Sequence, residues 1–286
     1  MAAPASALAK VNIFSCAPEW SALAQEIGGD QVKVYTASNA NQDIHHMRAK
    51  PSLLAAMRKA DLVICSGASL EIGWLPILLN KAGGRQVQEG AIGSIMASDY
   101  VQRLGVMEGK VDRSMGDIHP EGNPHVHLDP NNLIIIAGVM AQRLSEIDAD
   151  NAQLYEGNVQ SFKTKWAGLI AAWQSQASAL RGAKVAVYHK SWTYLLHWLG
   201  IENIASLEPK PGVPPTAAHL NDVLQKVQGQ EVVGILIAPF ESEKGAKWLS
   251  EKSGIPVIKL PFTIGGSDQT KDLESLFDDT LQRLHK

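Results

Sequence analysis

The sequence lacks several features that would place it in a specialised class of protein. It has 286 residues, and no apolar run approaches the ~20 residues that a membrane-spanning helix needs. Its 26 basic and 29 acidic residues give a formal net charge of -3 and form no block of either sign. A surface that binds nucleic acid or an anionic membrane is therefore not expected. With 45% apolar and 19% charged residues, the composition is that of an ordinary globular protein with one large or two ordinary domains.

Cysteine is scarce, since Cys16 and Cys65 are the only two. They can form one disulfide in an oxidising compartment or remain two buried thiols, and composition does not choose between these states. The segment Ala7-Leu8-Ala9 resembles the A-x-A site at which a signal peptide is cleaved, although no basic and apolar regions of a complete signal precede it. We therefore expect an exported, periplasmic protein with a truncated signal peptide. The alternative is a cytosolic protein with an irregular N-terminus.

Strand and helix patterns alternate at both ends of the chain. Short apolar runs such as Leu62 to Cys65 are typical of parallel strands that helices cover on both faces. The expected elements of the first half are strands at 11–16, 31–36 and 62–65 and helices at 19–27, 52–59 and 70–81. Those of the second half are strands at 184–188, 203–207, 232–238 and 257–260 and helices at 192–199, 216–227, 244–253 and 271–284.

Two helices are expected between these halves, at about 131–146 and from Asp150 to about Leu180. The second has apolar residues at helical spacing on one face, namely Tyr155, Phe162, Trp166, Leu169, Trp173 and Leu180. The pattern predicts an α/β protein in which one long rigid helix joins two doubly wound parallel-sheet lobes, with the ligand in the crevice between them. The expected parts are a first lobe at 10–130, a helical segment at 131–181 and a second lobe at 182–286.

Histidines and one carboxylate follow several of the predicted strands. His45 lies in the loop after the second strand, His125 in the loop that closes the first lobe, His189 directly after the strand at 184–188, and Glu241 just after the strand at 232–238. Ligands of open α/β sheets collect at the carboxyl ends of the strands, so these side chains are expected at one crevice. A lone histidine is more often structural, but several from separate strand ends indicate a metal site.

Three segments in order resemble a known family, the cluster A-I metal-binding proteins that feed zinc or manganese to ABC importers. They are residues 43–52 around His45, residues 123–130 around His125 and residues 188–194 around His189, and a proline-rich loop at 207–215 is similar as well. Ile44 departs from the family's proline, and His127 stands in the place of a tryptophan. The resemblance covers most of the chain.

The resemblance implies that His45, His125 and His189 bind the metal, with His46 and His127 as neighbours. The aspartate that the family often supplies falls close to Thr263 here, so Glu241, Asp268 or a water is expected in its place, and Glu241 is favoured because it ends a strand. Many zinc-importing members carry a long His-rich loop. In the corresponding region this chain has only His119, which we expect to be exposed and to help capture the ion.

Three imidazoles with at most one carboxylate favour Zn²⁺, because Mn²⁺ prefers more oxygen ligands. The resemblance thus implies an exported monomer that delivers Zn²⁺ to the permease of an ABC importer and is not an enzyme. A manganese-binding member of the same family is the first alternative. A zinc hydrolase is a second, but the sequence has no H-E-x-x-H helix and no nucleophile motif. An interaction module with structural zinc is the third.

Overall fold

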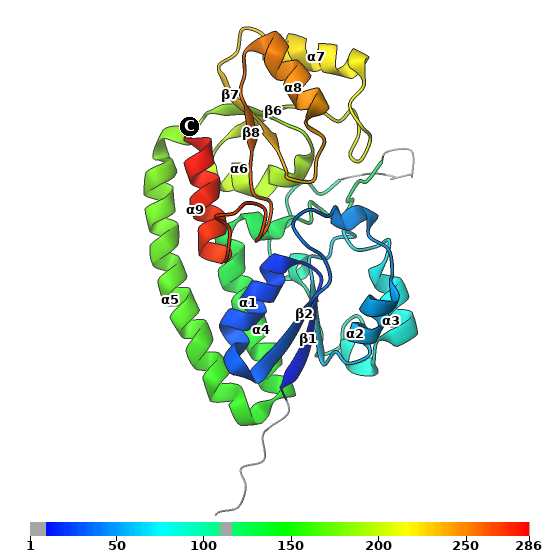
Figure 1. The fold of residues 1–286 in the computed structure, drawn as a ribbon. Helices are drawn as coiled ribbons and strands as arrows, with labels where there is room; N and C mark the ends of the chain where they lie inside the picture. Colours follow the sequence, from blue (N-terminus) through cyan, green and yellow to red (C-terminus); the bar gives the residue numbers. More distant parts are fainter. Residues whose placement is uncertain (1–9, 108, 110–115, 286) are drawn as a thin grey trace, which may run out of the picture.

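The computed structural model of the chain describes residues 10–107, 109 and 116–285. The N-terminal segment on which the export prediction depends lies outside these residues. Each half of the chain forms a four-stranded parallel sheet, and the two sheets lie one above the other in Figure 1. The strands are β1 (Val11–Ser15), β2 (Val32–Thr36), β3 (Leu62–Cys65), β4 (Ser94–Met96), β5 (Lys184–Val187), β6 (Glu202–Ser206), β7 (Val232–Ile237) and β8 (Val257–Lys259).

The two sheets have the same strand order. It is β2-β1-β3-β4 in the first and β6-β5-β7-β8 in the second, with all neighbours parallel. In both sheets the second strand lies on one side of the first strand, and the third and fourth lie on the other side. This is the arrangement of a doubly wound sheet, so the predicted fold class is confirmed. The three-residue strand β4 was not predicted.

Helices cover the sheets close to the predicted positions. They are α1 (Pro18–Gly28), α2 (Pro51–Met57), α3 (Leu75–Ala82), α6 (Thr193–Leu199), α7 (Ala217–Val227), α8 (Glu243–Ser253) and α9 (Leu273–Leu284). Thr216 caps α7, because its side chain accepts a hydrogen bond from the backbone N–H of His219. Helix α3 begins five residues later than expected, since Ala68 and Ser69 have the positive φ angles of a tight turn.

The long helix connects the lobes along one side of the molecule. Helix α4 (Pro130–Ile147) runs antiparallel beside α5 (Ala152–Gln176), and single 3-10 turns extend α5 at both ends (Figure 1). The buried face of α5 consists of Tyr155, Val159, Phe162, Trp166, Ile170 and Trp173, so Ile170 takes the central position expected for Leu169. Trp166 donates a hydrogen bond to the carbonyl of Pro130, and Trp173 donates one to Asp278 of α9.

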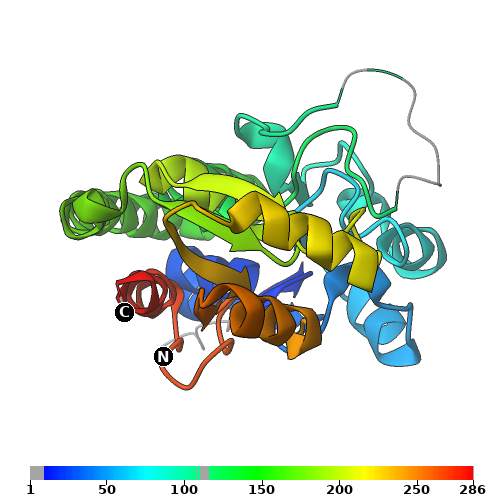
Figure 2. The same ribbon diagram turned by 90° about the horizontal axis from the view of Figure 1, so that it is seen from above.

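The lobes share one hydrophobic core. The same cluster contains Ile13 and Ile64 of the first sheet and Val185, Val187 and Leu236 of the second. Helix α9, although it follows the last strand of the second lobe, packs against α5 and α1 (Figures 1 and 2). The outer layer of the second lobe, which includes α7 and α8, has a smaller core of its own. The division into three parts remains a prediction, and α9 physically links the second lobe to the first.

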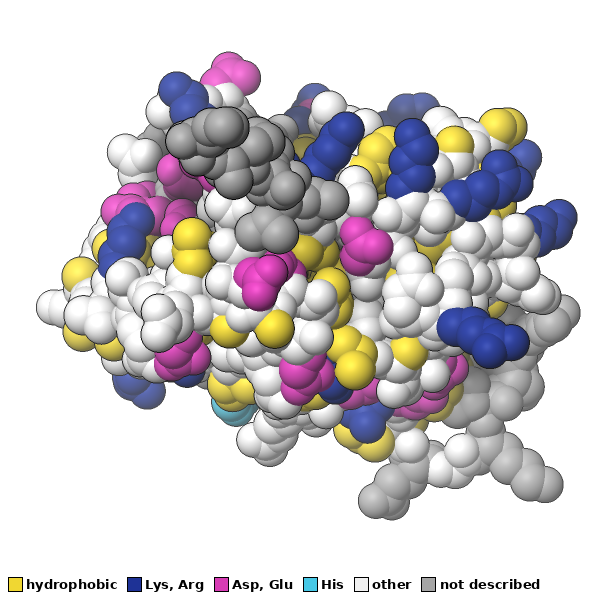
Figure 3. All heavy atoms as spheres, turned by 90° about the horizontal axis from the view of Figure 1, so that it is seen from below, with side chains coloured by type: hydrophobic (Ala, Val, Ile, Leu, Met, Phe, Trp, Pro, Cys, Tyr) yellow, Lys and Arg dark blue, Asp and Glu magenta, His cyan; other side chains and the backbone are white. Residues whose placement is uncertain are grey.

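Cys16 and Cys65 form a disulfide next to the carboxyl ends of β1 and β3, and both residues are fully buried. Of the two states that composition allowed, the structure has the bonded one. In the part of the chain that the structure describes, no helix is both long and apolar enough to cross a bilayer. On the face shown in Figure 3, acidic and basic side chains are both dispersed among uncharged ones.

Candidate metal centre

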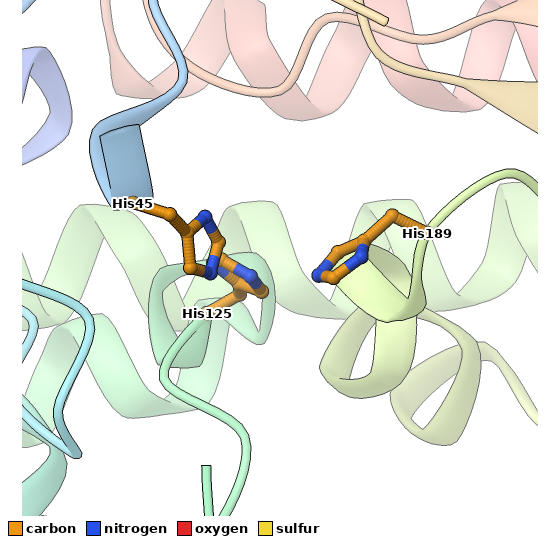
Figure 4. Close-up of side chains that lie close together, drawn as sticks. All are labelled: His45, His125 and His189. Carbon is orange, nitrogen blue, oxygen red and sulfur yellow. The ribbon is translucent and has the colours of Figure 1, made fainter. Parts of the chain in front are cut away.

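Three histidines from three separate segments meet at the carboxyl ends of the strands (Figure 4). His45 lies in the 3-10 turn that follows β2, His125 directly precedes the turn Val126–Leu128, and His189 comes two residues after the end of β5. One ligand atom from each ring lies within 4.8 Å of the other two. The distances between ring centroids are 5.7 Å for His45 and His125, 5.6 Å for His45 and His189, and 6.2 Å for His125 and His189.

The carboxylate of Asp43 orients His45. It caps the 3-10 turn by accepting a hydrogen bond from the His45 backbone N–H, and the same oxygen lies 2.8 Å from His45 Nδ1. Burial would raise the pKa of Asp43, but the hydrogen bonds and charge of His45 outweigh it and lower the pKa. An ionised carboxylate accepts the proton of Nδ1, which leaves Nε2 free to bind a metal.

Glu208 orients His189 in the same way. Its Oε2 lies 2.6 Å from His189 Nδ1 and also accepts a hydrogen bond from the backbone N–H of Gly212. Burial would lower the pKa of His189, but the hydrogen bond from Glu208 and its charge outweigh it and raise the pKa. Sequence reasoning gave Glu208 no role, although it follows β6 as Glu241 follows β7.

His125 is the most deeply buried of the three imidazoles, with 2% of its surface exposed. Neither ring nitrogen has a hydrogen-bond partner among the described residues. Burial, together with the neighbouring imidazoles, holds the pKa of His125 well below its usual range. A neutral imidazole with an unused lone pair in a buried site is suited to bind a cation, because an unpartnered buried polar group otherwise costs free energy.

The three rings line a cavity of about 170 Å³ that residues of both lobes enclose. Glu241 lines it too, with Oε2 bound to the backbone N–H of Ala238 and Oε1 buried without a partner in the described structure. Burial raises the pKa of Glu241 to about 7. Its carboxylate lines the same cavity as the three histidines but does not belong to the group of ligand atoms within 4.8 Å.

The other residue expected to replace the family aspartate also lies elsewhere. Asp268 is exposed and does not line the cavity. Thr263 is buried, and its hydroxyl donates a hydrogen bond to Glu19.

The two remaining histidines of these segments occupy the positions expected of neighbours. His46 is exposed and faces Asp43 and Asp117 at 3.7 and 3.5 Å. His127 is buried behind His125, with Nε2 3.0 Å from the carbonyl oxygen of Phe262 and Nδ1 3.6 Å from Glu19.

The predicted exposure of His119 was wrong. The side chain is half-buried, with Nδ1 2.8 Å from the carbonyl oxygen of Ala68 and Nε2 3.0 Å from Nε2 of His45. Burial and the charge of His45 lower the pKa of His119 to about 4. The backbone turn at Ala68, which no residue pattern indicated, gives this ring a buried hydrogen-bond partner.

A buried set of imidazole nitrogens, supported by hydrogen-bonded carboxylates, can hold one divalent cation of intermediate hardness.

Several named proteins are similar to this chain over most of its length. The manganese ABC transporter substrate-binding lipoprotein PsaA of Streptococcus pneumoniae is 22% identical over 260 residues, which are 89% of this chain and 81% of PsaA. The zinc-binding lipoprotein AdcA of the same species is 23% identical over 249 residues, which are 86% of this chain and 48% of AdcA.

Solved structures have the same fold. The crystal structure of ZnuA superposes with a TM-score of 0.79 at 23% identity and covers 96% of this chain and 97% of its own. The Mn-bound periplasmic metal-binding protein of Candidatus Liberibacter asiaticus gives a TM-score of 0.77 at 18% identity, covering 96% and 98%. The family model described as the periplasmic zinc-uptake complex component A matches residues 13–286. The chain therefore belongs to this family, whose members are extracytoplasmic metal-binding proteins of ABC importers and not enzymes.

Proposed function

We propose that this protein captures Zn²⁺ outside the cytoplasm and delivers it to the permease of an ABC importer. The observation that carries the proposal is the group formed by His45, His125 and His189, whose ligand atoms lie within 4.8 Å of one another and come from both lobes. These three imidazoles are the proposed ligands. Glu241, whose Oε1 has no partner among the described groups, remains the sequence-based candidate for the fourth position.

The donor atoms favour zinc over manganese, although the similar proteins include both manganese-binding and zinc-binding members. Imidazole nitrogen suits Zn²⁺, whereas Mn²⁺ prefers carboxylate, carbonyl and water oxygen. The carboxylates of Asp43 and Glu208 are already engaged by His45 and His189. The available donor atoms are therefore mainly imidazole nitrogens, which supports Zn²⁺ as the cargo and makes a manganese carrier the alternative.

A periplasmic location is part of the same proposal. The disulfide between Cys16 and Cys65 is of the kind that persists in oxidising compartments. Similar proteins are described as periplasmic or as lipoproteins. We further propose that the protein is a monomer and that Ala7-Leu8-Ala9 belongs to the end of a signal peptide.

Elemental analysis of protein purified without added metal tests the choice of ion. We expect one equivalent of zinc, and a titration with a chelator of known affinity should show that a large excess of Mn²⁺ does not displace it. The apo protein should stay folded, since a transport site must release its ion without unfolding the lobes. Manganese retained in the presence of equimolar zinc would instead establish the manganese alternative.

A further inference from the structure

His119 is placed as a metal ligand would be, although it belongs to no ligand set considered so far. Its ring centroid lies 5.1 Å from that of His45 and 6.5 Å from that of His125. The shortest contact is between the two Nε2 atoms of His45 and His119, at 3.0 Å. His45 therefore has His119 on one side and the rings of His125 and His189 on the others.

The hydrogen bonds of the two Nδ1 atoms determine whether the two Nε2 atoms at this contact carry a proton or a lone pair. The partner of His119 Nδ1 is the carbonyl oxygen of Ala68, which can only accept, so Nδ1 carries the proton and Nε2 has a lone pair. His45 donates from Nδ1 to Asp43 in the same way. Two nitrogen lone pairs repel one another unless a cation binds both. Around a tetrahedral zinc ion with bonds of 2.0–2.1 Å, two nitrogens lie about 3.3 Å apart, close to the separation here.

The Nδ1 atom of His119 makes the same kind of hydrogen bond as the Nδ1 atoms of two proposed ligands, His45 and His189. Histidines that bind metals usually donate their other ring N–H to a carboxylate or a backbone carbonyl. Asp43 does this for His45, Glu208 for His189, and Ala68 for His119. Ala68 itself has a φ angle of 45°, an uncommon value for a residue with a Cβ atom, and this turn directs its carbonyl to the ring.

The backbone around His119 is fixed to the second lobe on both sides. The N–H of Asp117 donates to the carbonyl of Pro211, and the side chain of Asn123 donates to the carbonyl of Lys190. His119 is thus held in position by contacts with the proline-rich loop and with the turn that follows His189.

We infer that His119 is the fourth ligand and that the site binds Zn²⁺ through four imidazoles. This inference rests on the proposed function and replaces Glu241, whose carboxylate is already bound to the N–H of Ala238. Thr263, at the position of the family's aspartate, is engaged by Glu19. A site with four nitrogens and no carboxylate discriminates against Mn²⁺ more strongly than one with a mixed ligand set.

X-ray absorption spectroscopy of the zinc-loaded protein tests the inference directly, because multiple scattering from imidazole rings counts the histidines on the ion. Four rings are expected in the parent protein and three in His119→Ala or His119→Gln. Chelator competition should show zinc affinity reduced about 10- to 100-fold in both variants, with a smaller ratio of zinc to manganese affinity. His119→Glu should lower that ratio further, because it replaces nitrogen with oxygen.

Three matched variants separate the possible outcomes. His219→Ala is the control, since His219 also donates a ring N–H to a backbone carbonyl, that of Ser206, but is not part of the histidine group. It should bind zinc as the parent does. Three rings and one oxygen in the parent, with binding weakened by Glu241→Gln and not by His119→Ala, would overturn the inference. If His189→Ala also bound zinc unchanged, the proposed function itself would fail.

Discussion

The first lobe brings its histidines to the metal centre on loops, whereas the second brings His189 almost directly from the end of β5. The sheets behind them have the same strand order, so the difference lies in the packing. The first sheet belongs entirely to the large core that includes α4 and α5, while the second divides its apolar residues between that core and a smaller one under α7 and α8. Identical topology therefore does not imply identical rigidity, and only the inner face of the second lobe is tied to the rest of the molecule.

The largest expected effects are those of substitutions in the two cores, which should differ in where hydrogen exchange increases. Trp166→Ala in α5 removes a side chain that is 2% exposed and its hydrogen bond to Pro130, and should lower the free energy of unfolding by about 3–5 kcal/mol. Hydrogen exchange should then increase in both lobes. Leu249→Ala in α8, a fully buried residue of the smaller core, should cost about 2–5 kcal/mol and increase exchange mainly in α7 and α8. If Leu249→Ala increased hydrogen exchange in α4 and α5 as much as in α7 and α8, the two cores would unfold as one unit.

The disulfide should stabilise the core that the two lobes share, since Cys16 and Cys65 both belong to it. Cys16 and Cys65 are separated by 49 residues, and a crosslink of that span contributes about 4 kcal/mol by restricting the unfolded chain. Cys16→Ser/Cys65→Ser should therefore unfold at lower denaturant concentration while the folded protein still binds zinc. Reduction of the parent protein with dithiothreitol provides the control without a substitution. An unchanged midpoint would mean that the folded state carries compensating strain.

The carboxylates that support the histidines offer a comparison between the lobes at the site itself. Glu208→Gln and Asp43→Asn should each weaken zinc binding by about 10- to 100-fold, because the orientation and basicity of the ligand are lost. Glu208 should have the larger effect, since its side chain is 9% exposed and that of Asp43 is 34% exposed. Titration with zinc chelators measures both. A larger effect of Asp43→Asn would show that the first lobe orients the ion more strongly.

The smallest expected effect concerns α9, the helix that joins the second lobe to the first. Asp272 caps α9, and hydrogen bonds from the side chain and backbone of Ser275 lower its pKa from the ordinary value of 3.8. A carboxylate with a lowered folded-state pKa stabilises the protein fully above about pH 4, and this contribution is lost as the pH falls through the folded-state pKa. Asp272→Ala should cost about 1 kcal/mol at pH 7 and much less near pH 2. Thermal unfolding at both pH values checks the sign.

Much of this architecture could be predicted from residue patterns, because apolar periodicity reports which faces are buried. The aromatic stripe of α5 and the alternation of strands and helices are of this kind. Strand β4 has three residues between turns and too short a pattern to detect. The position of His119 depends on the carbonyl of Ala68, 51 residues away, and the role of Glu208 depends on a contact with His189. Such contacts are set by tertiary structure, and local sequence does not encode them.

The packing of α9 has a consequence for biogenesis. A chain is synthesised from its N-terminus, so α5 is available well before α9, and Trp173 and its neighbours then lack the partners that Phe277 and Asp278 later supply. Completion of the core must therefore wait for the last residues of the chain. Until that moment the incomplete chain presents an apolar helix face, which is the kind of surface that promotes aggregation.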